Sequence, residues 1–170
     1  MVNTIDKGGG AERVAADLRH GLDRIGVDVR MAVGRKLGDD PKVLALAERP
    51  QNIWHALALG IEQCLAPVAG RMPGPQYVLM ATHYLGLPQR FRDWRAGREC
   101  FAYPASAVLM ASAARDFDLV HAHNLHGDYF DLAALARASR ALPVIITLHD
   151  EWLMTGHCAY TLGCERWRAG

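Results

Sequence analysis

The feature that most constrains this sequence is a strand, a glycine-rich loop, a helix and a second strand within its first 35 residues. Val2 to Ile5 predicts the end of a strand, and Gly8-Gly9-Gly10 follows it. Four apolar residues then recur at helical spacing and define one face of a helix: Val14, Leu18, Leu22 and Ile25. Gly26 would end this helix. Residues 27–33 alternate in polarity as a half-buried strand does, and the whole segment is a βαβ unit.

The same alternation returns in the last third of the chain. Residues 118–123 predict a short buried strand, and 127–140 a helix. Val144 to Leu148 is a β-branched run, typical of a parallel strand covered on both faces. The inner side of the helix is assigned to its apolar residues: Phe130, Leu132, Leu135 and Ala136. Alternating strands and helices predict an α/β fold with a Rossmann-like, doubly wound parallel sheet.

The middle of the chain is less regular. Residues 35–50 are polar and rich in turn formers, 53–68 predict an amphipathic helix ended by Gly70 and Pro73, and 77–87 fit a strand or a helix equally. A helix is also expected from Pro104 to about Arg115. The segment 90–98 holds four arginines and two aromatic residues. It suits an anionic head group or a membrane surface, although a solvated loop is the favoured interpretation.

Composition narrows the class of protein. The net charge of +1 over 170 residues argues against nucleic acid as a partner. The N-terminus has no secretory pattern, and the weakly polar stretch 102–114 falls short of the ~20 residues of a membrane span. Four cysteines do not make a disulfide framework in a chain of this length. We therefore expect a reduced, cytoplasmic protein.

Chemistry-bearing residues follow the predicted strands. The loop Gly8-Gly9-Gly10 lets backbone N–H groups and a helix N-terminus approach a phosphate, but it lacks the GxGxxG spacing of a dinucleotide site, so NAD is not favoured. Histidines follow two later strands, where ligands bind in parallel sheets: His121, His123 and His126 after one, His149 with Asp150 after the next. Alternation places His121 and His123 on one face, and a buried structural role for His121 is an equal alternative.

A zinc site is the alternative reading of these histidines. No HExxH pair supports it, and a second candidate cluster supplies only three ligands where structural zinc usually has four: His157, Cys158 and Cys164. No metal and no cofactor is therefore the expectation.

Three segments, in order, resemble bacterial glycosyltransferases of family 4. They are Asn3 to Arg13, Asp118 to Gly127, and Thr147 to Cys158, with Gly163 to Trp167 as an extension. The resemblance implies one half of a two-domain GT-B architecture: residues 1–170 as the N-terminal, acceptor-side domain, with the C-terminal donor-binding domain absent. It implies a retaining transferase of the hexosyltransferase type, inactive as this chain alone, in cell-surface polysaccharide biosynthesis.

The resemblance also implies roles for residues and partners. His149 lies beside the transferred sugar as the catalytic residue. Gly8, Gly9, Gly10 and Asp150 face the donor diphosphate and sugar. The acceptor side is assigned to four residues: His123, Asn124, His126 and Arg13. The expected partners are a nucleotide sugar and a glycan or lipid-linked acceptor, with self-association and peripheral contact at the inner membrane face. A zinc-binding hydrolytic domain and a non-catalytic glycan-binding module remain the alternative functions.

Overall fold

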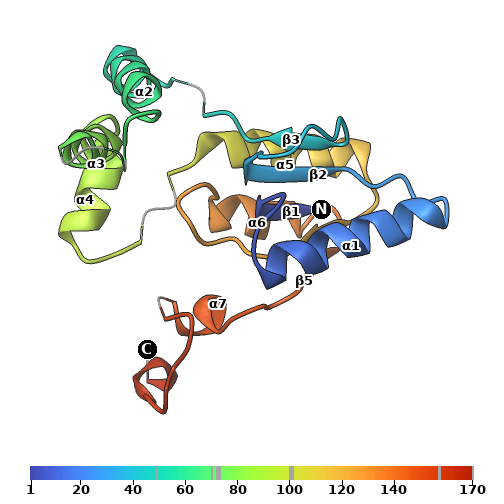
Figure 1. Ribbon diagram of the computed structural model, residues 1–170. Coiled ribbons are helices and arrows are strands. Elements are labelled where there is room, and N and C mark those ends of the chain that lie inside the picture. The colour runs from blue at the N-terminus through green and yellow to red at the C-terminus, as the bar shows by residue number, and fades with distance from the viewer. Residues whose placement is uncertain (49, 70, 72–73, 100–101, 157, 170) are drawn as a thin grey trace. The chain divides into compact units, whose positions relative to one another are not determined.

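The computed structural model describes residues 1–48, 50–69, 71, 74–99, 102–156 and 158–169 (Figure 1). The chain forms two compact units. The sheet unit contains Met1–Ala47 and Ala105–Gly170, and the helical unit contains Glu48–Pro104. The helical unit therefore interrupts the sheet unit along the sequence.

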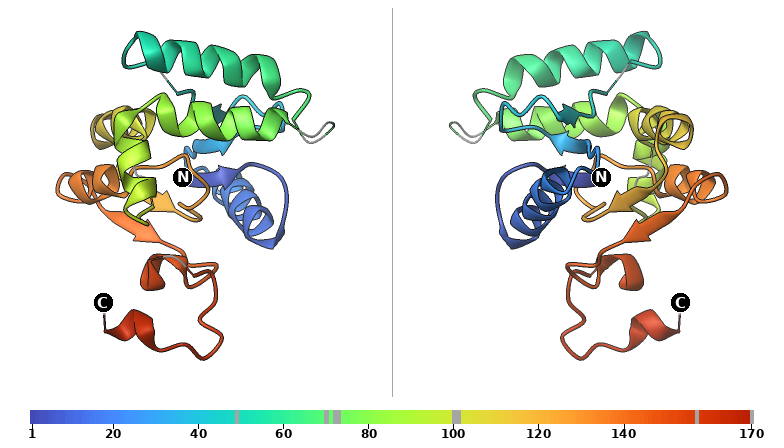
Figure 2. Two further views of the ribbon diagram at one scale, coloured as in Figure 1. Left: turned by 90° about the vertical axis from the view of Figure 1, so that its left-hand side faces the viewer. Right: turned by 90° about the vertical axis from the view of Figure 1, so that its right-hand side faces the viewer.

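The sheet unit alternates strands and helices. Its elements are β1 (Val2–Ile5), α1 (Gly10–Arg24), β2 (Met31–Arg35), β3 (Val43–Ala45), α5 (Pro104–Asp116), β4 (Val120–Ala122), α6 (Leu132–Ala138), β5 (Val144–Ile146), α7 (Trp152–Thr155) and the 3-10 helix η1 (Arg166–Arg168). The five strands form one parallel sheet in the order β3-β2-β1-β4-β5. Helix α1 covers one face, and α5 and α6 cover the other (Figure 2). The predicted doubly wound α/β fold is confirmed.

The first βαβ unit is confirmed in outline and corrected in detail. Gly26 ends α1 in a left-handed conformation, with φ of +88°. The face of α1 toward the sheet is not the apolar stripe, because Val14 and Ile25 are 52% and 76% exposed while Ala15 is fully buried. Ala15 packs in a cluster with side chains of two strands. A small residue on the inner face lets the helix approach the sheet closely.

Strand β2 begins at Met31 rather than at Val27, and it is covered on both faces. Ala32 is as well buried as its neighbours Met31 and Val33, so the half-buried pattern is wrong here. The reason is position, since β2 lies between β1 and β3. The turn-rich segment 35–50 supplies β3, which pairs in parallel with β2 and was not predicted.

The last third also departs from the prediction. The helix expected from Gly127 begins at Leu132, because Gly127 and Asp128 have φ of +97° and +56° and a helix cannot pass through them. Phe130 and Leu135 are buried as predicted, but Ala136 is exposed. Strand β5 is one of the two edge strands of the sheet that the described residues form. Its Ile145 is 48% exposed, so it is not covered on both faces.

The helical unit contains α2 (Ile53–Leu65), α3 (Pro75–Leu85) and α4 (Pro88–Arg95). Helix α2 was predicted, and α3 resolves the open choice for residues 77–87. The predicted end of α2 at Gly70 and Pro73 lies outside the described residues. The arginine-rich segment is helical as far as Arg95, so a loop was the wrong prediction there, although Arg92, Arg95 and Arg98 are exposed as expected. Arg90 is 1% exposed and pairs with the carboxylate of Glu48.

Arg90 makes two further contacts within the helical unit. Its guanidinium also donates to the carbonyl of Ala102 at 3.2 Å and lies 4.7 Å from the ring centre of Tyr103. These contacts tie α4 to both ends of the unit. Among the helices that the structure describes, none combines the length and apolarity that crossing a bilayer requires.

Candidate active site

The candidate site lies at the carboxyl edge of the sheet. There the loop after β1 carries the glycines, the loop after β4 carries His123 to His126, and the loop after β5 carries His149 and Asp150. Strand β1 pairs with β4, and β4 with β5, so the three loops follow adjacent strands. Ligands bind at this edge in doubly wound folds.

The glycine loop opens α1. Gly9 is the N-cap, and the carbonyl of Gly9 accepts the first helical hydrogen bond from the amide of Arg13 at 3.1 Å. A Cβ on Gly9 would lie 3.0 Å from Oε2 of Glu12, whereas one on Gly10 would meet nothing within 4 Å. The carboxylate of Glu12 therefore stands beside Gly9, and the open side of the loop is at Gly10. Arg13 is exposed in the first turn of the same helix.

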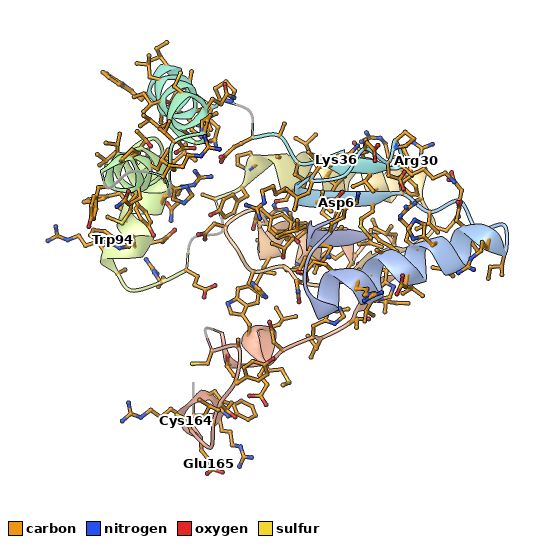
Figure 3. The ribbon with its side chains drawn as sticks, in the orientation of Figure 1. Asp6, Arg30, Lys36, Trp94, Cys164 and Glu165 are labelled. Atoms are coloured by element: carbon orange, nitrogen blue, oxygen red, sulfur yellow. The ribbon has the colours of Figure 1, made fainter. Side chains whose placement is uncertain are left out.

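Asp6 fixes the start of this loop. It follows β1, while Lys36 follows β2 (Figure 3). Its carboxylate accepts hydrogen bonds from the amides of Leu37 at 2.6 Å and Gly38 at 2.8 Å. Burial raises the pKa of Asp6, but these backbone donors outweigh burial, and the net pKa lies below its usual value. The charged carboxylate thus joins the loops after β1 and β2.

The loop after β4 is held through its backbone. Thr4 on β1 donates to the carbonyls of Asn124 at 3.2 Å and His126 at 3.1 Å. The amide of Asn124 donates to the side chain of Asn3 at 3.3 Å. The hydroxyl of Tyr129 also donates to the carbonyl of Asn124. Since burial raises the pKa of Tyr129, this hydroxyl remains a donor. The site loop is therefore built onto β1.

Three histidines stack across β4 and β5. The rings of His121 and His123 lie 4.4 Å apart, and those of His123 and His149 lie 5.3 Å apart. This confirms that His121 and His123 share a face. Nε2 of His121 bonds to the hydroxyl of Thr147 at 2.7 Å, and Nδ1 of His123 bonds to Nε2 of His149 at 3.0 Å.

A second polar pair flanks the stack. Nε2 of His126 lies 2.9 Å from a carboxylate oxygen of Asp150. The other oxygen of Asp150 accepts from the amide of Trp152 at 3.0 Å, at the start of α7. The ring of His126 meets that of Trp152 edge-on at 5.6 Å. The Asp150 carboxylate is thus oriented by two donors. In general a carboxylate accepts hydrogen bonds from hydroxyl groups and repels anionic groups such as a diphosphate.

These residues border one shallow hollow that is open to solvent. Its lining comes from the loops after β4 and β5 and includes His123, Asn124, His126, His149 and Asp150. The structure therefore brings together five of the predicted site residues. The glycine loop after β1 and Arg13 in the first turn of α1 do not line this hollow.

The predicted metal alternatives find little support. Within the part of the chain that the structure describes, no three His, Cys, Asp or Glu side chains are grouped so that they could hold a metal ion. Cys158 and Cys164 are free and exposed in the C-terminal segment, where Figure 3 labels Cys164. His157 lies outside the described residues.

The parallel sheet with a glycine loop and histidines at its carboxyl edge defines a class: α/β proteins that bind a ligand at this edge. The chain belongs to glycosyltransferase family 4, whose model matches residues 8–169. Over 59 residues it is 36% identical to the putative colanic acid biosynthesis glycosyl transferase WcaC of Escherichia coli strain K12. The match covers 31% of this chain and 15% of that relative. No solved structure matches the chain. Family membership does not favour the zinc alternative.

Sequence reasoning missed three contributors to the site. Asp6, Thr4 and Tyr129 position the loops without facing the hollow, and their residue types are common in any α/β chain. The donors to Asp6 are the amides of Leu37 and Gly38, which lie more than 30 residues away in the sequence, so its role was not predictable from the glycine loop. Thr4 bonds to carbonyls more than a hundred residues away in the sequence. Tyr129 reaches Asn124 across a turn. No local sequence pattern predicts either contact.

Proposed function

We propose that the protein carrying this chain transfers a hexosyl group from a nucleotide-sugar donor to a glycan or lipid-linked acceptor, with retention of anomeric configuration, in cell-surface polysaccharide biosynthesis. The observation that carries the proposal is the placement of His149 and Asp150 at the hollow beside the loop that opens α1. The name of the relative WcaC supports the polysaccharide role. Because the match spans only 15% of that relative, the activity of the whole protein is part of the proposal.

Each site residue takes a role that fits its surroundings. The amides of the glycine loop, open at Gly10, suit the donor diphosphate. His149 is the catalytic residue beside the transferred sugar, and Asp150 accepts from sugar hydroxyls. The acceptor side comprises the loop after β4 and the first turn of α1: Asn124, His126 and Arg13 contact the acceptor, and His123, which is 3% exposed, lies behind them.

The reaction is a substitution at the anomeric carbon. The acceptor hydroxyl oxygen forms a bond to that carbon on the face from which the nucleoside diphosphate departs, and the bond from the carbon to the diphosphate oxygen breaks. The hydroxyl proton leaves with the departing diphosphate. Backbone N–H groups aimed at the diphosphate stabilise the charge that develops there. No metal and no cofactor other than the donor is part of this proposal.

The proposal extends to the organisation of the protein. The sheet unit supplies the acceptor side of a GT-B cleft, and a second Rossmann-like domain supplies most donor contacts. The acceptor, if lipid-linked, brings the protein to the inner face of the cytoplasmic membrane as a peripheral enzyme. The 170-residue chain alone is therefore expected to show no turnover.

The test uses the longest natural protein that contains this chain. It is incubated with a panel of nucleotide sugars and lipid-linked or oligosaccharide acceptors, with EDTA present, and the released nucleoside diphosphate is measured. NMR of the product gives the anomeric configuration. We expect turnover with one donor, and His149→Ala lowers kcat by about 10²-fold or more.

The matched control is His20→Ala, which removes a histidine from α1, outside the hollow. It is expected to leave kcat unchanged. Release of a product with inverted configuration, or full activity of the His149 variant, contradicts the proposal. Turnover by the 170-residue chain alone that depends on a metal ion would favour the zinc alternative.

A further inference from the structure

The contact between His123 and His149 joins a buried histidine to the proposed catalytic one. Nδ1 of His123 and Nε2 of His149 are 3.0 Å apart, and the rings are nearly parallel, with an angle of 21°. His123 is 3% exposed, whereas His149 is only partly buried. The buried ring of His123 therefore packs against the more accessible ring of His149 and bonds to it.

His123 is neutral in the folded protein. Burial, followed by the neighbouring His121 and His149, lowers the pKa of His123 to about 4. A neutral imidazole carries one N–H, so one ring nitrogen donates and the other accepts. The direction of the bond to His149 depends on which nitrogen of His123 holds that proton.

The surroundings of His123 choose between the two tautomers. Its Nε2 is buried and has no hydrogen-bond partner among the described residues. A proton on Nε2 would therefore be a buried, unpaired N–H, which folded proteins avoid more strictly than an unpaired acceptor. A proton on Nδ1 is paired with His149 at once. The favoured tautomer of His123 is the one that donates from Nδ1.

We propose that His123 is a positioning residue: it donates from Nδ1 to Nε2 of His149 and thereby holds the proton of His149 on Nδ1. The inference rests on the proposed role of His149 in transfer. With Nε2 occupied as an acceptor, His149 presents an Nδ1–H donor, which suits a hydroxyl or ring oxygen of the transferred sugar. His149 then orients and polarises the sugar and does not act as a base through Nε2.

The partner of an active-site histidine commonly sets which ring nitrogen carries the proton. Here the partner is itself a histidine rather than a carboxylate. A neutral partner of this kind fixes the tautomer of His149 without bringing a charge into the site.

The test reads the tautomer of His149 directly. Two-dimensional ¹⁵N–¹H NMR of the imidazole rings, at pH 7.5, distinguishes the protonated from the bare nitrogen of each histidine in the full protein. We expect a bare Nε2 and a protonated Nδ1 on His149 in the unaltered protein. A protonated Nε2 on His149 overturns the proposal, and this measurement needs no variant.

Two variants separate the hydrogen bond from the packing of the ring. His123→Phe keeps a ring but removes the donor, so His149 should shift to the Nε2–H tautomer that free histidine prefers. His123→Asn places an amide N–H near the position of Nδ1 and should retain the Nδ1–H tautomer. His121→Phe is the matched control, because His121 bonds to Thr147 and not to His149. An unchanged His149 tautomer in His123→Phe contradicts the proposal.

Kinetics of the same variants give the second measurement. His123→Phe should lower kcat by about tenfold to a hundredfold with little change in the acceptor KM, and His123→Asn should recover most of that loss. A raised acceptor KM with unchanged kcat would mean that His123 binds the acceptor directly. If the protein has no transferase activity, the proposed function fails, whereas the NMR result still decides the tautomer.

Discussion

The ring of Tyr129 packs directly on the backbone of Gly34. A Cβ placed on Gly34 would lie 2.6 Å from Cγ of Tyr129, closer than any side-chain atom can remain. Gly34 belongs to β2, and the hydroxyl of the same tyrosine bonds to the carbonyl of Asn124 at the candidate site. The absence of a side chain at Gly34 therefore leaves room for the tyrosine that holds the site loop.

Gly34→Ala is expected to destabilise the sheet unit. The added methyl must displace Tyr129 or the strand, and such overpacking costs about 1–3 kcal/mol. Urea unfolding followed by circular dichroism measures the loss. Gly21→Ala in α1 is the matched control, because its Cβ meets nothing within 4 Å. That change should raise stability by about 0.5–1 kcal/mol. Equal effects of the two substitutions would contradict the packing argument.

Asp6→Asn is expected to weaken the junction of the loops after β1 and β2. The amide group of asparagine places a donor opposite one of the two backbone N–H groups, so one bond is lost and the charge assistance disappears. The cost is about 1–3 kcal/mol, measured by urea unfolding. Asp39→Asn, at an exposed position nearby, should change stability little. A neutral result for Asp6→Asn would show that the junction is not charge-dependent.

Stability should fall as the pH is lowered from about 6.5 to about 4. The pKa of folded His123 is about 4, below its unfolded value near 6.5, so the unfolded state binds more protons in this window. The difference between the folded and unfolded pKa of His123 corresponds to about 3 kcal/mol of unfolding free energy. Burial lowers the pKa of His55 and His121 in the same direction. Asp6 contributes only near its unfolded pKa of about 3.9 and below, as its folded pKa is also lowered.

Urea unfolding at pH 7.5, 6 and 5 measures this dependence. His123→Phe should flatten the curve between pH 6.5 and 5, whatever its effect on stability at neutral pH. Equal slopes for the two proteins would show that His123 titrates normally in the folded state.

Arg90→Met should open the helical unit. It leaves the carboxylate of Glu48 without its buried partner, and removing one member of a buried pair costs about 3–5 kcal/mol. Limited proteolysis should then cleave within residues 48–104. Adding Glu48→Leu should restore part of the loss, since the unpaired charge is removed.

The exposed pair in the same unit is the control for Arg90. Arg98 lies 3.6 Å from Asp93, and its side chain is 70% exposed. Arg98→Met should cost no more than about 1 kcal/mol. A similar cost for both arginines would mean that burial of Arg90 adds nothing to the strength of its pair.

The sequence predicted the sheet unit because its strands are apolar runs between glycines and helices. It did not predict β3, since three residues in a turn-rich segment carry too little pattern, and it misjudged the inner face of α1, because the close approach uses Ala15 rather than larger side chains. Arg90 was treated as a surface charge because its partner Glu48 lies 42 residues away. Local patterns report periodicity, but partners distant in the chain decide burial.

The candidate site was predictable at the level of residue types and strand ends. The alternation of side chains along the strand correctly predicted that His121 and His123 lie on the same face, where their rings stack. The bond from His123 to His149 depends on the relative register of β4 and β5, and register is set by packing rather than by either strand. The nearness of Glu12 to Gly9 follows from a side-chain conformation, which sequence spacing permits but does not require.

The bonds from Thr4 to the loop after β4 also bear on the order in which the molecule forms. Thr4 and Asn124 are 120 residues apart, and the whole helical unit is synthesised between them. During translation β1, β2 and β3 emerge together, and the helical unit can complete its own contacts before β4 leaves the ribosome. Closing so distant a contact is slow. We therefore expect the pairing of β1 with β4, and with it the candidate site, to form after the contacts within β1 to β3 and within the helical unit.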